Sequence, residues 1–511
     1  MTIAPDAAAA PTPPPALQPE RRLHPLSWLF VLLAHLKQFI FPILVLLFFG
    51  RGDRNDLWSV VVICVLATLS IWRYYTYRFR IGRDSLQIRS GMLERSLREI
   101  PFARIQNVAL HQTLLHRIFG VAEVRLESAG GIKPEAEMRV LKLSDAMALE
   151  ALVRRRRGEA VADAETATAA SRGDVLYALG LGDIVRLGLI SNRGMIVVGG
   201  AFAAFAQFSP DLLSDLLEKW GRAMFGVFEG YLSGFGHGHV ASAALVLLLC
   251  FVIVLRMFSI GIALLNYAGF RLEEHGRRLT LERGLFTRLR TSTPRRRIQS
   301  WILHEGMLHR WFGRRTLEVS TAVLENGSRH HHPRSLRELA PVATPERCDA
   351  LIRHLAPQLH WPPAEWQPLH RLTFWRLLLP QLLLASAIGA VAWWRLGKLG
   401  LIFVALWVPW IAYIAWQNAR HAGYAADDRL VAVRGGWWTR EWRFAEIGKL
   451  QAIRWGQTPV DRMLGMARLL LDTAGGNAME KPLQLRFLPE ADARALFERL
   501  CHTQARQSLR W

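Results

Sequence analysis

The chain has 511 residues, of which 51% are hydrophobic, and its 64 Lys and Arg against 42 Asp and Glu give a formal net charge of +22. The hydrophobic residues are clustered in long runs flanked by arginine, which is typical of a membrane protein with soluble parts and excludes a wholly disordered chain. The basic charge is therefore interpreted as membrane-related, because the sequence contains no helix–turn–helix or aromatic RNA-binding motif.

Six apolar segments are candidate membrane spans, and they occur in three pairs. The pairs lie at 26–49 and 57–72, at 194–208 and 240–265, and at 377–394 and 399–416. The segment at 194–208 is the weakest. Arginines flank the outer ends of each pair, whereas the 209–239 connection is acidic. The positive-inside rule then predicts that both termini and all soluble parts are cytoplasmic.

The soluble parts that follow the pairs repeat one pattern with identical spacing. Internal repeats of this kind define an architecture before any single element is assigned. The repeated positions are Gly91, Arg104, Gln106, Arg117 and Gly120 in the first copy, Gly284, Arg297, Gln299, Arg310 and Gly313 in the second, and Gly436, Gln451, Arg462 and Gly465 in the third.

Each copy is predicted to be strand-rich and to end with one helix. Apolar and polar residues alternate at 85–89, 279–283 and 430–434, and the glycine that follows predicts a turn into the next strand. Apolar residues at helical spacing follow Ser144, Thr344 and Pro489. In the second copy Thr344 is a predicted N-cap and Pro345 the first helical residue.

A membrane hairpin, then strands, then an Arg-Ile-Gln … His-Arg-x-Phe-Gly stretch, then a closing helix resembles the bacterial pleckstrin-homology-like (PH-like) membrane family. The resemblance covers residues 23–500 and is weaker in the third copy, where Glu446 and Asp461 depart from the pattern. It implies an α+β membrane protein of the bacterial inner membrane, with three transmembrane helical hairpins. Each hairpin would be followed by a PH-like β-barrel with a C-terminal capping helix. It implies no enzyme activity and a loose link to envelope stress or resistance to antimicrobial peptides.

The predicted organisation contains ten segments. They are a disordered tail (1–22), a hairpin (23–73), a PH-like domain (74–157), a linker (158–185), a hairpin (186–267), a PH-like domain (268–356), a linker (357–371), a hairpin (372–419), a PH-like domain (420–504) and a C-terminal tail (505–511).

Two basic clusters are candidate contacts with anionic lipid, because arginine near a membrane is attracted to anionic headgroups. An ordinary solvated face is the alternative. The clusters consist of Arg154, Arg155, Arg156 and Arg157 in the first copy, and of Arg288, Arg290, Arg295, Arg296 and Arg297 in the second. For Arg117, Arg310 and Arg462 we favour a structural salt bridge or carbonyl cap over an anion contact. The repeated glycines are expected to adopt backbone conformations that a side chain disfavours.

Metal and transport sites are weakly indicated. The run at 330–332 with His304 and His309 invites a metal hypothesis, but no carboxylate or cysteine stands at ligand spacing. We therefore expect no metal and no cofactor. His35 and Lys37 lie near the cytoplasmic end of the first predicted span, where snorkelling accounts for them.

The favoured function is a non-catalytic scaffold or adaptor. Its expected partners are membrane lipids and a second membrane protein of the same family, with no nucleic acid and no small-molecule substrate. The alternative is a transporter or channel component formed by the six spans.

Overall fold

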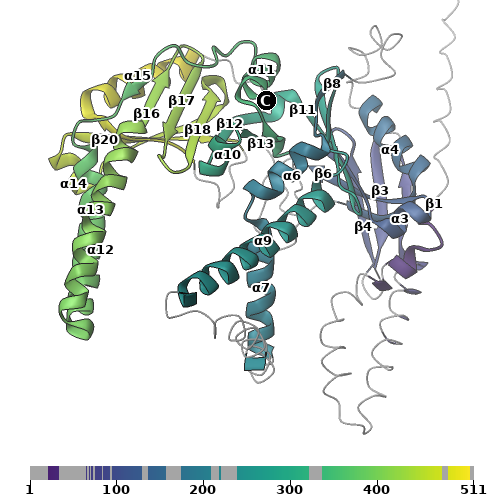
Figure 1. Ribbon diagram of the computed structural model, residues 1–511. Helices are drawn as coiled ribbons and strands as arrows, with labels where there is room; N and C mark the ends of the chain where they lie inside the picture. Colours follow the sequence, from purple (N-terminus) through teal and green to yellow (C-terminus); the bar gives the residue numbers. More distant parts are fainter. Residues whose placement is uncertain are drawn as a thin grey trace, which may run out of the picture. The chain divides into compact units, whose positions relative to one another are not determined.

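The computed structural model describes residues 21–30, 32–33, 75–82, 84–91, 95–128, 136–156, 174–208, 239–321, 336–474 and 482–506, with a few isolated positions. The chain divides into two compact units, Met1–Ser171 and Arg172–Trp511. The first unit holds one copy of the repeat, and the second holds the other two (Figure 1).

The first unit contains two antiparallel sheets, a short helix and a closing helix. One sheet has the strand order β1 (Arg21–Arg22), β2 (Arg78–Ile81), β3 (Ser85–Ser90) and β4 (Ser96–Pro101). In the other, β6 (Val121–Ser128) pairs with β5 (Ile105–Gln112) and with β7 (Ala136–Lys142). Helix α3 (Leu114–Ile118) joins β5 to β6, and α4 (Leu143–Arg156) closes the unit. Leu86, Leu126 and Met138, all fully buried, are part of a core between the sheets and α4.

The second copy repeats this order in the second unit. Its first sheet contains β8 (Asp174–Ala178), β9 (Arg271–His275), β10 (Arg278–Arg283) and β11 (Arg288–Pro294). Its second part contains β12 (Ile298–Glu305), α10 (Met307–Trp311), β13 (Arg315–Thr321), β14 (Glu338–Ala343) and the closing helix α11 (Pro345–Leu355). Between β8 and β9 lie α6 (Leu181–Ile190), α7 (Arg193–Phe208) and α9 (His239–Tyr267).

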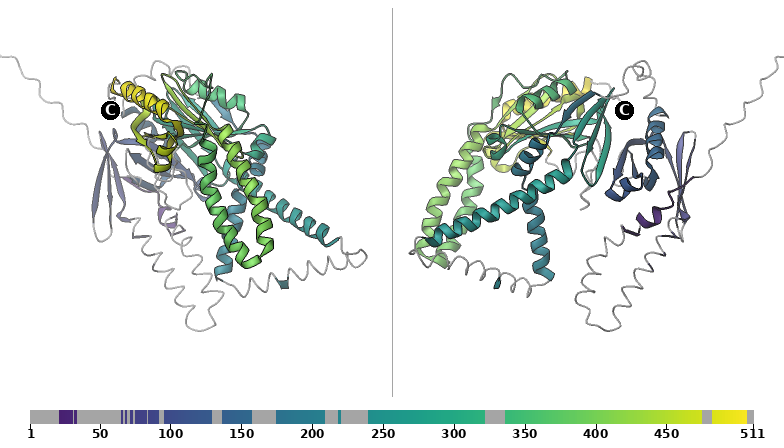
Figure 2. Two further views of the ribbon diagram at one scale, coloured as in Figure 1. Left: turned by 90° about the vertical axis from the view of Figure 1, so that its left-hand side faces the viewer. Right: turned by 45° about the vertical axis from the view of Figure 1, so that its right-hand side comes forward.

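The third copy follows the same plan. Its first strands are β15 (Gln367–Pro368), β16 (Gly423–Ala426), β17 (Leu430–Gly435) and β18 (Arg440–Glu446), and its hairpin is α12 (Thr373–Leu396) with α13 (Lys398–His421). It ends with β19 (Leu450–Gly456), α14 (Pro459–Met463), β20 (Met466–Thr473), β21 (Leu483–Pro489) and α15 (Glu490–Arg506). Figures 1 and 2 show α11 and α15 on the side of this unit's sheets away from α12 and α13.

The first strand of each copy precedes its hairpin. β1 pairs with β2, β8 with β9 and β15 with β16, so each hairpin is inserted between two paired strands. The predicted tail 1–22 and the predicted linkers 158–185 and 357–371 thus contain the strands β1, β8 and β15. β1 and β15 have only two residues each, and β8 does not alternate apolar and polar residues. The partner strands lie beyond the hairpin in sequence.

The sheets of the described residues are open and do not close into the barrel expected from sequence. Instead, β12 of the second copy pairs antiparallel with β18 of the third, from Ser300↔Ala445 to Glu305↔Arg440. An exposed sheet edge carries unpaired backbone groups that need partners. Here the edge of one copy is satisfied by the next copy along the chain.

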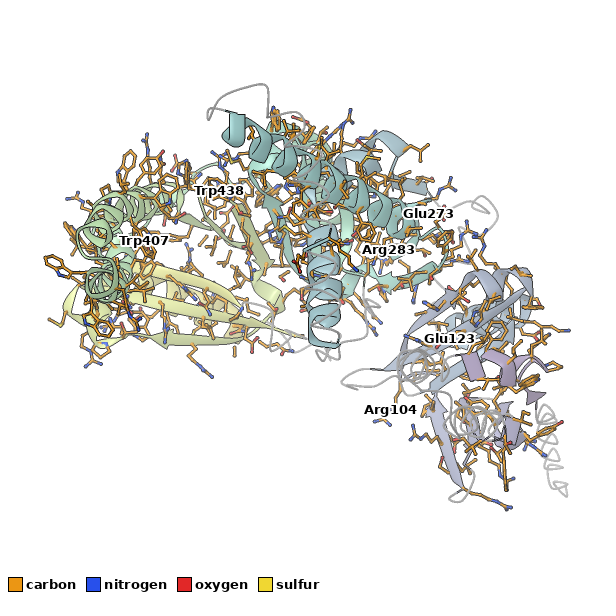
Figure 3. The ribbon with its side chains drawn as sticks, turned by 60° about the horizontal axis from the view of Figure 1, so that its bottom comes forward. Arg104, Glu123, Glu273, Arg283, Trp407 and Trp438 are labelled. Atoms are coloured by element: carbon orange, nitrogen blue, oxygen red, sulfur yellow. The ribbon has the colours of Figure 1, made fainter. Side chains whose placement is uncertain are left out.

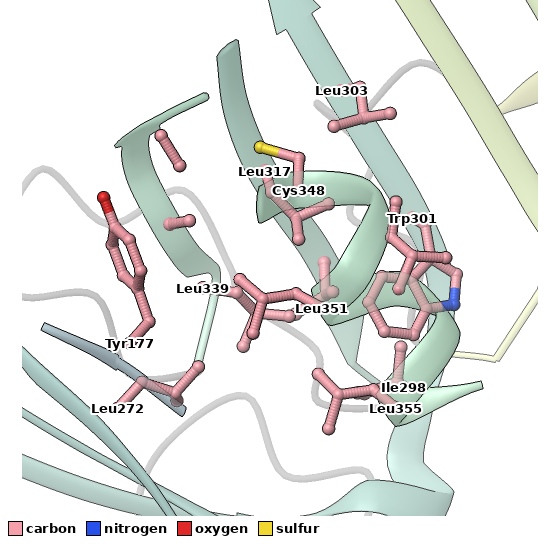
Figure 4. Packing of buried hydrophobic residues seen from close by; sticks show 14 of the residues in the cluster. Tyr177, Leu272, Ile298, Trp301, Leu303, Leu317, Leu339, Cys348, Leu351 and Leu355 are labelled. Atoms are coloured by element: carbon pink, nitrogen blue, oxygen red, sulfur yellow. The ribbon is translucent and has the colours of Figure 1, made fainter. Parts of the chain in front are cut away.

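The first sheet of the third copy is consequently buried on both faces. Ala432 and Phe444 belong to the core of the second copy, while their neighbours Val431 and Ala445 belong to the core of the third. The second copy contributes Trp301, Leu303 and helix α11 to the shared core, which Figure 4 shows around Leu351 and Leu355. The two copies therefore form one packed body.

Two helices in the described part of the chain are long and apolar enough to cross a membrane, over Leu248–Tyr267 and Thr373–Arg395. Most of the first predicted hairpin lies outside the described residues. Helices α12 and α13 pack closely, since a Cβ on Gly389 would lie 2.8 Å from Cγ2 of Val404. Of the six predicted spans, the described residues therefore show two, in α9 and α12.

Candidate functional site

The candidate site is the junction where the hairpin helices meet the sheets of each copy. In the second copy three side chains converge on the carboxylate of Glu338, the first residue of β14. Arg193 of α7 donates a hydrogen bond to Oε1 at 2.7 Å, and Arg283 of β10 donates to Oε2 at 2.8 Å. The Tyr267 hydroxyl, at the end of α9, donates to Oε2. Because β10 and β14 lie in different sheets, this network ties both hairpin helices to both sheets.

The charges of this junction favour an ionised Glu338. Its side chain and that of Arg283 are each only 13% exposed, whereas Arg193 is 49% exposed. Burial by itself would raise the pKa of Glu338. The opposing effect of Arg193 and Arg283, with the Tyr267 hydrogen bond, is larger and holds this pKa below its ordinary value of 4.5. Figure 3 shows Arg283 among the side chains of this unit.

Helix α9 also fixes the bend between α6 and α7. Arg256 donates to the carbonyl of Leu189 at 2.9 Å, and Ser259 donates to that of Ser191 at 2.9 Å. Both carbonyls are at the C-terminal end of α6, where no intrahelical donor remains. A Cβ on Gly188 would lie 2.5 Å from Cα of Ile260, so the two helices approach closely. The polar side chains of α9 therefore donate their hydrogen bonds to the end of α6.

The third copy uses a different pair at its junction. Arg376, in the first turn of α12, donates to Oδ1 of Asp461 in α14 at 2.7 Å. Asp461 also caps its own helix, accepting from the Thr458 amide at 3.1 Å. Burial would raise the pKa of Asp461, but the Thr458 and Arg376 hydrogen bonds outweigh it and lower this pKa.

Copy one has an aromatic contact at the equivalent place. Phe30 packs on the His116 ring with centroids 4.2 Å apart, and His116 in turn lies 2.6 Å from Oγ1 of Thr113. Phe30 and Arg376 occupy matching positions in their copies, as do His116 and Asp461. The replacement of histidine by aspartate in the third copy thus accompanies the replacement of phenylalanine by arginine.

Strand turns also bind the hairpins. The amides of Gly284 and Leu285, in the β10–β11 turn, donate to the carbonyls of Ala268 and Leu265 at 2.9 Å each. In the β17–β18 turn the Trp437 amide donates to Oδ1 of Asn418 of α13 at 2.9 Å. Each of these turns therefore rests against the last residues of its hairpin.

The second basic cluster lies partly inside the domain. Arg295 donates to the carbonyls of His354 and Leu355, which end α11, and Arg297 is only 8% exposed. Arg290 pairs with Glu282 at 3.3 Å. Arg295 thus supports the closing helix, and the exposed members are Arg288 and Arg296.

The first basic cluster lies at the end of α4, where the structure describes the backbone of Arg154, Arg155 and Arg156, while Arg157 lies outside the described residues. Among the repeated arginines, Arg310 donates to the Trp438 carbonyl at 3.4 Å. The other two, Arg117 and Arg462, are exposed.

The remaining repeat positions have mainly structural environments. Arg104 and Gln451 are exposed, and Gln299 is buried with its amide directed to the Arg297 carbonyl. Every repeated glycine has positive φ, in the region that glycine alone enters without strain. The values are 130° for Gly91, 63° for Gly120, 105° for Gly284, 61° for Gly313, 83° for Gly436 and 66° for Gly465.

The described residues contain no group of three His, Cys, Asp or Glu side chains placed to hold a metal ion. The histidine run at 330–332 and the pair His35 and Lys37 lie outside the described residues. His309 instead accepts from the Gly306 amide and contacts Thr316, both within its own copy.

No motif in the sequence marks Glu338, Tyr267 or Asp461 as part of a site. Glu338 stands alone at the start of a strand, and Arg193 was interpreted only as a topology marker. No spacing rule connects residues so far apart in the chain, so the junctions are visible only in the folded structure.

Comparison with known proteins agrees with this architecture. A family model described as "Bacterial PH domain" matches residues 31–157, 226–356 and 377–504. The chain is also 23% identical over 358 residues to the UPF0699 transmembrane protein YdbT of Bacillus subtilis (strain 168), which covers 66% of this chain and 69% of that protein. No solved structure matches the chain.

Proposed function

Because the chain belongs to the bacterial PH domain family, we propose that it is a non-catalytic, multi-pass membrane protein that acts as a scaffold or adaptor at the cytoplasmic membrane. Its three PH-like copies would face the cytoplasm and bind lipid, protein or both. We further propose a second membrane protein of the same family as its partner. A link to envelope stress or resistance to antimicrobial peptides is part of the proposal.

The observation that carries this proposal is the attachment of hairpins to sheets by polar contacts. Glu338 joins α7 and α9 to both sheets of the second copy, and Arg376 joins α12 to α14. The shared β12–β18 sheet also holds two copies together. A body fixed to its spans at several points is suited to hold a surface at constant distance from the membrane.

Six spans with cytoplasmic termini predict a definite fusion pattern. Reporter fusions after residue 225 are expected to read as periplasmic, and fusions after residues 140, 330 and 480 as cytoplasmic, because basic residues stay on the inner side. The measurement is the ratio of alkaline phosphatase to fluorescent-protein activity at each site. A periplasmic signal at any of the last three sites would contradict this topology.

The first basic cluster is expected to favour anionic lipid. Replacing Arg154, Arg155, Arg156 and Arg157 with glutamine in the full chain should weaken its selectivity for spin-labelled anionic lipid, measured by electron paramagnetic resonance in vesicles. Each arginine near the surface contributes about 1 kcal/mol, and the difference from wild type should shrink with salt. The matched control is Arg494→Gln on α15, which is expected to change nothing. Equal selectivity of the quadruple variant and wild type would show that the cluster is a solvated face.

Solute flux distinguishes the scaffold from the transporter alternative. The full chain reconstituted in sealed vesicles is expected to leave their ion and solute permeability unchanged. A flux that is seen only with the protein present would favour a transporter or channel component. The soluble domains must be folded in the same sample, so that damage to the vesicles by unfolded protein is excluded.

A further inference from the structure

We propose that the short helix after the fifth strand of each copy, namely α3, α10 and α14, inserts into the lipid interface of the membrane. One repeat position would enter the boundary between headgroups and acyl chains: Ile118, Trp311 and Met463. This inference rests on the membrane placement in the proposed function and adds the elements that touch lipid.

One repeat position carries an exposed apolar side chain in all three copies. Ile118 is 73% exposed, Trp311 81% and Met463 86%, although each is large and apolar. Single exposed apolar residues are ordinary on protein surfaces. Three different apolar side chains at the same place in three copies are not explained by chance exposure, because a polar residue would be equally compatible with that position in water.

The apolar surface extends beyond that one residue on every short helix. The other exposed apolar residues in these helices, or directly after them, are Leu114, Leu115 and Phe119 in the first copy, Met307 and Phe312 in the second, and Val460 in the third. Apolar residues gathered on a small surface mark a site of interaction with protein or membrane.

The short helices are also held beside residues of the hairpins or of the segments that lead into them. Phe30 contacts α3, and Arg376 bonds α14 to the first turn of a candidate span. In the second copy Arg314, just after α10, pairs at 3.2 Å with Asp183 of α6, the helix that leads into α7. Within the second unit α10 and α14 lie on the same side of the sheets as α12 and α13 (Figures 1 and 2).

Neighbouring turns favour lipid over a protein partner. Leu285 and Phe286 are 44% and 49% exposed in the turn bound to the end of α9, and Trp438 is 55% exposed beside the residue bound to α13. Arg310 of α10 donates to the Trp438 carbonyl, which joins the short helix to that turn. Tryptophan at the end of a span, with arginine beside it, is the composition of a membrane interface.

The arginine that precedes the inserted residue fits the same surface. Arg117, Arg310 and Arg462 each stand directly before the exposed apolar residue. The exposed guanidinium groups of Arg117 and Arg462 can reach a lipid phosphate while the next residue enters the apolar layer, since arginine forms strong paired hydrogen bonds with phosphate. Arg310 is instead directed to the Trp438 carbonyl.

The test uses the full chain with its four cysteines replaced, carrying one new cysteine at a time. The variants Ile118→Cys, Trp311→Cys and Met463→Cys are labelled with an environment-sensitive fluorophore and reconstituted in vesicles. The vesicles contain lipids with a nitroxide quencher either near the headgroup or deep in the acyl chain. Glu498→Cys on α15 is the water-exposed control, and Met257→Cys, in the middle of the span in α9, is the control within a span.

The label at the three positions is expected to be quenched most strongly by the shallow nitroxide, because an interfacial helix buries its apolar face about 5–10 Å below the headgroups. Labels that behave like the one at Glu498 would overturn the inference. So would labels that are shielded from water but unquenched by any lipid, since a protein would then cover them. If the label at Met257 also escapes the deep quencher, the membrane placement fails, and the proposed function fails with it.

Discussion

Glu338→Ala is expected to destabilise the second unit by about 3 kcal/mol, because it leaves two buried or half-buried arginines without their shared carboxylate. This value is at the low end for a broken buried pair, since Arg193 remains 49% exposed. The hairpin should loosen against both sheets. The measurement is the thermal unfolding of the full chain in detergent, together with hydrogen exchange at the end of α9 and in β14.

Two further variants distinguish the loss of the Glu338 contacts from the loss of any one carboxylate. Glu318→Ala removes a partner of Arg337, a guanidinium that is 46% exposed, and is expected to cost at most about 1 kcal/mol. Glu338→Gln keeps the shape and an acceptor for Tyr267, so it should fall between wild type and Glu338→Ala. Equal stability of the Glu338→Ala and Glu318→Ala variants would contradict the assigned role.

The Glu338 junction also predicts a dependence on pH. Its folded pKa lies below 4.5, so the unfolded chain binds the proton more readily and the folded state is favoured when the carboxylate is ionised. This stabilisation is fully present above the unfolded pKa and is lost as pH falls through the folded pKa. Wild type should therefore lose more stability than Glu338→Gln as the pH falls from above 4.5 through the folded pKa, as measured by thermal unfolding. If the stability of the two proteins falls equally with pH, Glu338 is not the cause of the pH dependence.

Phe444→Ala is expected to cost about 3–5 kcal/mol and to separate the second and third copies. Phe444 is fully buried and stacks against Trp301 at 6.0 Å and against Trp361 at 4.0 Å between ring centroids. Trp301 is also its partner across the β12–β18 pair. Loss of the ring should expose the amides of both strands to hydrogen exchange.

A phenylalanine within one copy provides the control for this variant. Phe497 of α15 packs on Trp455 with ring centroids 6.2 Å apart, and both belong to the third copy. Phe497→Ala should destabilise that copy and leave the β12–β18 amides protected. If Phe444→Ala leaves those amides equally protected, the shared core does not hold the two copies together.

The local pattern of the chain determined much of this fold. Alternating residues at 279–283 and 430–434 predicted β10 and β17, and the N-cap at Thr344 predicted α11. The apolar runs predicted α9 and α12. These features depend on neighbouring residues, whose periodicity and capping are set by backbone geometry, so a single sequence is enough to recognise them.

Only the tertiary structure decided how the copies are joined and where the hairpins are fixed. β12 and β18 pair over a long sequence separation, and an edge strand accepts any partner that offers complementary backbone groups and side chains. Glu338 of β14 likewise acquires its role from Arg193, Tyr267 and Arg283, which three other elements bring to it. Such contacts follow from the packing of whole domains, and no local period or spacing in the sequence encodes them.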